Sequence, residues 1–165
     1  MSNTNYVCDN MCCNIITCFS IYKTFHKRNN KKAGIFIYDP SEDRVLLVQS
    51  SGLYWGPPKG TLEETLGETI LECAIREVKE ETGLLISPQE LKGELKIKNK
   101  ITYFYCERKT CTVEIQKMEG NDANGITWIK LPCLIDLVKN KKMLINKHCQ
   151  IACNKFLGTK FPEFV

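Results

Sequence analysis

The sequence lacks the features that direct a chain into or across a membrane. Its first ten residues, MSNTNYVCDN, place no basic cluster ahead of an apolar run, which argues against a secretory signal peptide. The most apolar run, residues 11–22, is interrupted by Asn14 and is shorter than the roughly 20 residues that a spanning helix needs. No Asn-x-Ser/Thr acceptor site occurs, and there is no repeat or low-complexity stretch. We therefore expect a cytoplasmic protein with no membrane contact.

Cysteine is abundant, with ten residues among 165, but no pair has the C-x-x-C spacing of zinc knuckles and thioredoxin sites. Four of the ten occur early and could gather a metal: Cys8, Cys12, Cys13 and Cys18. Cys8 and Cys12 also fall at helical spacing with apolar neighbours, which favours a helix with buried thiols. Cys149 and Cys153 stand one helical turn apart, and packing is favoured there too. We expect reduced thiols and no zinc.

The pattern of apolar residues predicts a mixed sheet with helices on its faces, which is an α/β fold. Strands are predicted over residues 33–38, 44–49, 91–98, 101–107, 111–117 and 126–131. Helices are predicted over about 67–82, 133–139 and 143–157. We divide the chain into a leader, residues 1–32, with helical potential and a basic end, and a domain, residues 33–165, with a basic helical C-terminal part.

Acidic residues concentrate in one segment of a chain whose formal net charge is +4. Residues 60–90 hold eight glutamates and only two basic residues. On a helix Glu77, Glu80 and Glu81 would share a face, and each like-charged pair would cost a few tenths of a kcal/mol. Glu80 and Glu81 also lie near the helix C-terminus, where the dipole disfavours anions. Because Arg76 and Lys79 are too few to neutralise the cluster, the pattern favours a hard divalent cation such as Mg²⁺.

Residues 60–84 resemble the Nudix box, the loop–helix–loop signature of Nudix hydrolases. Glu68 precedes Arg76 at the family spacing, and residues 76–84, REVKEETGL, match the family pattern throughout. The sequence departs from that pattern between Gly60 and Glu68, where seven residues replace five. The resemblance implies a Nudix α/β/α sandwich that carries its catalytic loop–helix–loop at residues 60–84. It also implies Mg²⁺ or Mn²⁺ as cofactor and hydrolysis of phosphoric anhydride bonds.

The resemblance also implies roles for the matched residues of the helix. Glu77, Glu80 and Glu81 would bind the metal and position the attacking water. Arg76 would orient Glu77 through a charge-assisted hydrogen bond. Glu68 would support the metal site, although residues 65–68 also have the sequence of a capping box with Thr65 as N-cap.

Further site residues lie in the segments before and after the helix. The backbone carbonyl of Lys59 would be another metal ligand, because Gly60 lets the chain approach closely. Asp122, six residues before Trp128, or nearby Glu119 is the candidate for an extra metal ligand or general base, although Asp122 fits a turn equally well. The candidates for substrate binding are Lys59, Gly60, Trp55, Tyr103 and Tyr105, although at least two of the three aromatic residues at 103–105 are expected to be core strand residues.

The substrate class is narrowed by two further resemblances. Residues 54–60, YWGPPKG, are similar to the corresponding segment of mRNA-decapping enzymes and diadenosine tetraphosphate hydrolases, and Pro57 favours the second type. Residues 72–83 are similar to the decapping type. We expect a metal-activated water to cleave a diphosphate linkage in a nucleoside polyphosphate or a capped RNA 5′ end. The alternatives are a diadenosine tetraphosphate or diphosphoinositol polyphosphate hydrolase, and a non-catalytic Nudix module that binds nucleotide or RNA.

Basic residues outside the helix raise the possibility of contact with RNA. The leader ends in a basic patch, and seven lysines follow Ile129, but a lysine-rich composition explains them equally well. A leader of 32 residues is shorter than the helical domain that precedes the Nudix domain in cellular decapping enzymes. This length argues against a close cellular decapping orthologue and is compatible with a viral or parasite enzyme. For a viral protein the expected location is the host cytoplasm.

Overall fold

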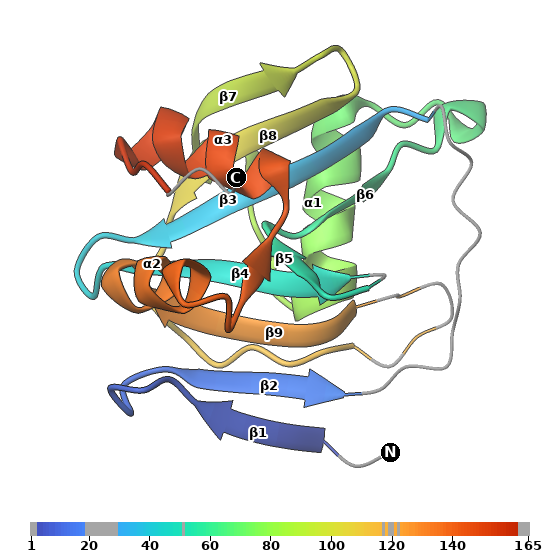
Figure 1. Ribbon diagram of the computed structural model, residues 1–165. Helices are drawn as coiled ribbons and strands as arrows, with labels where there is room; N and C mark the ends of the chain where they lie inside the picture. The colour runs from blue at the N-terminus through green and yellow to red at the C-terminus, as the bar shows by residue number, and fades with distance from the viewer. Residues whose placement is uncertain are drawn as a thin grey trace.

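The computed structural model describes residues 3–18, 30–50, 52–116, 118, 121 and 123–161. Its centre is a mixed sheet with strand order β1-β2-β9-β4-β3-β8-β7 (Figure 1). The pairing of β3 with β8 is parallel, and the other pairings along this path are antiparallel. These strands are β1 (Asn3–Val7), β2 (Asn14–Cys18), β3 (Lys32–Asp39), β4 (Arg44–Ser50), β7 (Leu91–Ile97), β8 (Ile101–Glu107) and β9 (Ala123–Lys130). Three short strands pair off this path: β5 (Tyr54–Gly56), β6 (Lys59–Thr61) and β10 (Leu144–Ile145).

Helices cover both faces of the sheet (Figure 1). The helix α1 (Ile70–Thr82) packs on one face, and α2 (Leu131–Lys139) and α3 (Lys147–Leu157) lie on the other. Successive residues of β4 alternate between the two cores: Leu46 packs in the cluster that includes α1, and Leu47 in the cluster that includes α2 and α3. Two 3₁₀ turns, η1 (Glu64–Leu66) and η2 (Pro88–Glu90), flank α1 in the sequence. The predicted α/β sandwich is confirmed.

The turn between β3 and β4 encloses a buried carboxylate. Asp39 accepts hydrogen bonds from the Ser41 N–H at 2.9 Å, the Ser41 hydroxyl at 2.6 Å and the Thr110 N–H at 2.6 Å. Burial by itself raises the pKa of Asp39, but these hydrogen bonds outweigh it and hold the pKa well below its usual range. Asp39 therefore ties the turn to the segment after β8 as an ionised group.

Two predicted elements differ from the structure. The strand predicted over residues 111–117 is wrong, because the described residues 108–116 have no regular structure. They cross the C-terminal end of α1, where a Cβ on Gly83 would lie 2.7 Å from the Gln116 side-chain nitrogen. The last helix begins at Lys147, because Leu144–Ile145 pair with β5 and Asn146 caps the helix by accepting from the Cys149 N–H.

The helix predicted in the leader is also wrong. Residues 3–18 form a hairpin of β1 and β2, and β2 pairs with β9 at Ile16↔Ile126 and Thr17↔Gly125. Ile15 is buried and Asn14 is exposed, which is the two-residue alternation of a strand. The basic residues 23–28 of the leader lie outside the described residues.

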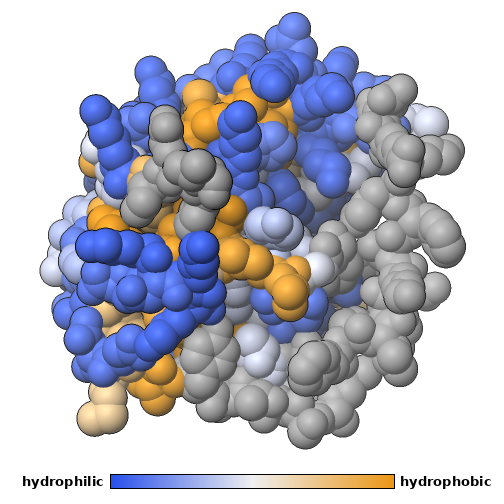
Figure 2. All heavy atoms as spheres, viewed as in Figure 1, coloured by the Kyte–Doolittle hydropathy of each residue, from blue (hydrophilic) through white to orange (hydrophobic). Residues whose placement is uncertain are grey.

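The surface on the side seen in Figure 1 is mainly hydrophilic. Figure 2 shows hydrophilic side chains over most of the described part of this face, with smaller hydrophobic areas between them. Among the described residues, every helix is too short or too polar to cross a membrane.

Candidate active site

The helix α1 is defined at both ends by its own residues. Thr69 is the N-cap: its hydroxyl accepts from the Glu72 N–H at 3.2 Å, and the Glu72 carboxylate accepts from the Thr69 N–H at 2.8 Å. Gly83 ends the helix with a φ of 77° and donates its N–H to the Lys79 carbonyl. The capping box predicted at residues 65–68 is therefore wrong, because Thr65 lies in η1 and the Glu68 carboxylate binds elsewhere.

Arg76 gathers three carboxylates around one guanidinium group. Its Nε and Nη2 donate to the two oxygens of Glu68 at 2.6 and 3.0 Å. Its Nη1 donates to Glu77 at 2.9 Å and to Glu80 at 3.1 Å, and Nη2 also donates to the Thr61 carbonyl. The hydrogen bond to Glu68 raises the pKa of Arg76, so the guanidinium stays charged. The predicted contact of Arg76 with Glu77 is present, and the same group positions Glu68 and Glu80.

Glu77 lies against the backbone of Gly60. Its side chain is 14% exposed, and burial raises its pKa to about 7 although Arg76 acts in the opposite direction. A Cβ on Gly60 would overlap the Glu77 carboxyl group. Only glycine therefore lets β6 pass this close to the helix.

Glu81 is the most buried carboxylate of the cluster, with 3% of the residue exposed. One of its oxygens accepts from the Lys59 N–H at 2.9 Å, which fixes the loop before β6 to the last turn of α1. Burial lowers the pKa of His148, and the charges of Lys59, Lys32 and Lys98 act in the same direction.

The donor set of this site fits a hard divalent cation. Glu77, Glu80 and Glu81 lie on one helix face with Glu68 close by, and Arg76 is the cation that contacts three of these four glutamates. Carboxylate oxygens are the ligands that Mg²⁺ and Mn²⁺ prefer, so three partly or fully buried glutamates on one helix face are suitable donors. Gly60 leaves room for one of these carboxylates, because a Cβ at this position would overlap the Glu77 carboxyl group.

The substrate-binding residues predicted from sequence are only partly brought to this site. Lys59 and Gly60 adjoin it, but Trp55 and Tyr103 are buried in the core, so neither presents a ring to a ligand. Tyr105 packs against Phe36 and Phe156, with ring centroids 6.3 and 5.1 Å away. Glu119 and Asp122 lie outside the described residues. Their role as an extra metal ligand or general base therefore stays a prediction.

Asn121 is a site residue that sequence reasoning missed. Its side-chain amide donates to the Glu80 carbonyl at 3.0 Å and to the Gln116 carbonyl at 2.7 Å. Its side-chain oxygen accepts from the Ala123 N–H at 3.0 Å. These bonds tie the segment before β9 to the acidic helix. No sequence signal marks them, because Asn121 lies in a stretch that also has turn composition.

The loop at Gly60, the acidic helix α1 and the contacts of Arg76 form the loop–helix–loop that the Nudix resemblance implied for residues 60–84. The chain belongs to the Nudix hydrolase family, since the NUDIX domain profile matches residues 28–145. Putative hydrolase 111R of Invertebrate iridescent virus 3 is 33% identical over 129 residues, covering 76% of this chain and 73% of that protein. The asymmetrical bis(5′-nucleosyl)-tetraphosphatase of Mus musculus is 32% identical over 127 residues, covering 70% and 85%.

A solved structure supports the fold. A bifunctional NMN adenylyltransferase/ADP-ribose pyrophosphatase from Francisella tularensis, complexed with AMP and a Mn ion, superposes with a TM-score of 0.58. The two sequences are 19% identical, and the match covers 81% of this chain and 42% of that one.

Proposed function

We propose that the protein hydrolyses a diphosphate linkage in a nucleoside polyphosphate, with Mg²⁺ or Mn²⁺ held by α1. The observation that carries the proposal is the arrangement of Glu68, Glu77 and Glu80 around Arg76, with Glu81 fixed by the Lys59 N–H. The manganese ion of the Francisella structure is consistent with this metal class.

Each residue of the cluster has a distinct task in this proposal. Glu77, Glu80 and Glu81 hold the cation, with the Lys59 carbonyl as a further ligand. Arg76 keeps two of these carboxylates in place, and Glu68 fixes Arg76 through two hydrogen bonds. A divalent cation bound there would lower the pKa of a coordinated water and offset charge on the phosphate oxygens. Glu119 or Asp122 is proposed to accept the proton of the attacking water.

A dinucleoside polyphosphate is the substrate class we favour. The Mus musculus relative is a bis(5′-nucleosyl)-tetraphosphatase, and Pro57 points to the same type. Lys59, whose backbone N–H binds Glu81, adds a positive charge close to the site for a polyanion. Capped RNA is the second candidate, and it is supported by the resemblance of residues 72–83 to decapping enzymes.

Product analysis with a substrate panel tests the proposal. Diadenosine tetraphosphate, cap analogue, capped RNA and a diphosphoinositol polyphosphate are each incubated with the protein and Mg²⁺ or Mn²⁺. We expect turnover of diadenosine tetraphosphate that chelator abolishes. Glu81→Gln should lose at least about 100-fold in kcat. Glu72→Gln is the matched control, because it makes the same substitution on the same helix at a position where glutamine also completes a capping box.

Two outcomes would contradict the proposal. Full activity of Glu81→Gln would remove Glu81 from the metal site. Tight nucleotide binding without turnover of any substrate, and without an effect of chelator, would identify a non-catalytic Nudix module.

A further inference from the structure

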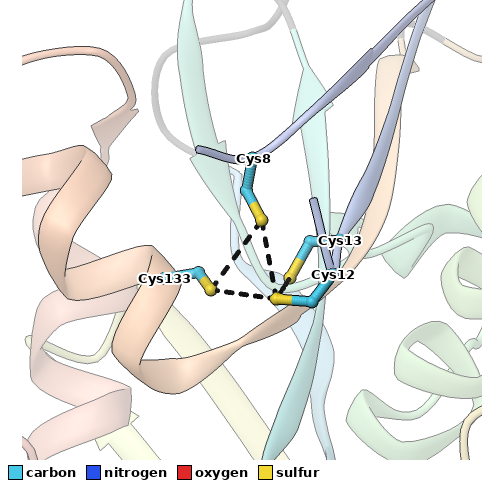
Figure 3. Close-up of side chains that lie close together, drawn as sticks. All are labelled: Cys8, Cys12, Cys13 and Cys133. Carbon is cyan, nitrogen blue, oxygen red and sulfur yellow. Dashed lines mark hydrogen bonds between the residues drawn. The ribbon is translucent and has the colours of Figure 1, made fainter. Parts of the chain in front are cut away.

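Four cysteines from two distant parts of the chain meet on the face of the sheet that carries α2. Cys8 follows β1, Cys12 and Cys13 precede β2, and Cys133 lies in the first turn of α2. Figure 3 shows that the four side chains point toward one another. Their sulfur atoms all lie within 4.8 Å of one another, and the four thiols are free.

The distances between the sulfur atoms match a tetrahedral metal site. Four of the six sulfur–sulfur distances are 3.6 Å for Cys8–Cys12, 3.8 Å for Cys8–Cys133, 3.7 Å for Cys12–Cys13 and 3.3 Å for Cys12–Cys133. Four sulfurs bound to Zn²⁺ at about 2.3 Å stand about 3.8 Å apart along the tetrahedron edges. A disulfide needs about 2.05 Å, so the cluster has the spacing of metal ligands.

Hydrogen-bond donors surround the sulfur atoms. The Lys130 N–H donates to the Cys13 sulfur at 3.2 Å, and the Asn10 side-chain amide donates to the Cys133 sulfur at 3.6 Å. Arg44 reaches the Cys13 sulfur at 3.8 Å and holds the turn by donating to the Cys12 carbonyl at 2.7 Å. The N-terminal end of α2 adds the positive end of a helix dipole beside Cys133. Such donors stabilise the negative charge that four thiolates keep around a divalent ion.

The cluster also has an entry path and a structural purpose. A surface pocket of about 330 Å³ is lined in part by Cys8, Cys133 and Asp136, which gives an ion access from solvent. Among the described residues, β2 pairs with β9 at two positions, Ile16↔Ile126 and Thr17↔Gly125. A metal bound by Cys133 and the three hairpin cysteines would fasten the hairpin to α2.

We propose that Cys8, Cys12, Cys13 and Cys133 bind one structural Zn²⁺ ion through four thiolates. Four ligands close the tetrahedral shell and leave no position for substrate, which distinguishes a structural from a catalytic zinc site. Binding converts four thiols to thiolates and releases their protons to solvent. The proposal departs from our expectation, drawn from sequence spacing, that the protein binds no zinc.

Zinc content after chelator treatment tests this site separately from the acidic one. The full chain is washed with EDTA, and zinc is measured by mass spectrometry. We expect about one zinc per chain in the wild type, Cys111→Ser and Glu81→Gln. The double variant Cys12→Ser/Cys133→Ser should fall at least about tenfold. Cys111 is the matched control, because it is an exposed cysteine outside the cluster.

X-ray absorption at the zinc edge of the wild type tests the proposed zinc site even if the double variant fails to fold. The expected spectrum has four sulfur ligands at about 2.3 Å. Oxygen or nitrogen ligands would overturn the proposal. So would disulfides among the four cysteines, a wild type without zinc that takes up none when it is added, or zinc lost in Glu81→Gln and kept in the double variant.

Discussion

Gly60→Ala tests the contact between β6 and the catalytic helix. A Cβ at this position would overlap the Glu77 carboxyl group, so the carboxyl must move by about 1 Å or more. A displacement of this size at a reacting centre costs about 10²-fold in rate. We therefore expect kcat on diadenosine tetraphosphate to fall about 100-fold and metal affinity to fall with it.

The same substitution should leave the fold intact. Overpacking of one methyl group costs about 1–3 kcal/mol, which is less than the usual 5–15 kcal/mol of a domain. The comparison is Gly93→Ala in β7, where a Cβ would have no atom within 4 Å. Urea unfolding monitored by circular dichroism, together with steady-state kinetics and Mn²⁺ titration, separates the two effects. A folded Gly60→Ala protein with kcat within about twofold of wild type would refute the placement of Glu77 at the reaction centre.

Three other substitutions give distinct outcomes. Arg76→Lys should lose about 10- to 100-fold in kcat, because one ammonium cannot hold three carboxylates; unchanged kinetics would contradict the role of Arg76. Thr69→Ala should lower the free energy of unfolding by about 1 kcal/mol in urea titrations, while Thr65→Ala should leave it nearly unchanged; the reverse result would restore the capping box at Thr65. Asp39→Asn should cost about 1–3 kcal/mol at pH 7. Because the pKa of Asp39 is depressed in the folded state, its contribution exists above about pH 4 and fades as pH falls. The variant and wild type should therefore converge in stability at low pH, and an equal difference at pH 7 and pH 2 would contradict this.

The acidic site could be predicted from sequence because its main parts are local. Glu77, Glu80 and Glu81 share one helix face by spacing alone, and Arg76 lies within the same turns. The sequence predicts that the acidic helix begins at about residue 67, whereas α1 begins at Ile70. The prediction is too early because both Thr65–Glu68 and Thr69–Glu72 have the composition of a capping box. Tertiary contact decides between them, since the Glu68 carboxylate is occupied by Arg76.

The cysteine cluster could not be predicted from sequence. Cys12 and Cys133 are 121 residues apart, and the pairing of β2 with β9 brings the hairpin near α2. Within residues 8–18 the apolar spacing fits a helix, and a segment this short does not distinguish that period from a strand pair joined by a turn. Trp55 and Tyr103 illustrate the same difficulty, because an aromatic residue near a motif fits the core and the site equally well until the fold is known.

In the proposed function, the carboxylates of α1 hold the divalent ion on which hydrolysis depends. Mn²⁺ binding, followed by electron paramagnetic resonance in the same samples in which hydrolysis of diadenosine tetraphosphate is timed, tests it most directly. The rate should rise in proportion to bound Mn²⁺ in the wild type and in Glu72→Gln, and both quantities should collapse in Glu77→Gln/Glu81→Gln. Undiminished hydrolysis by the double variant, or by wild type in excess chelator, would contradict the claim.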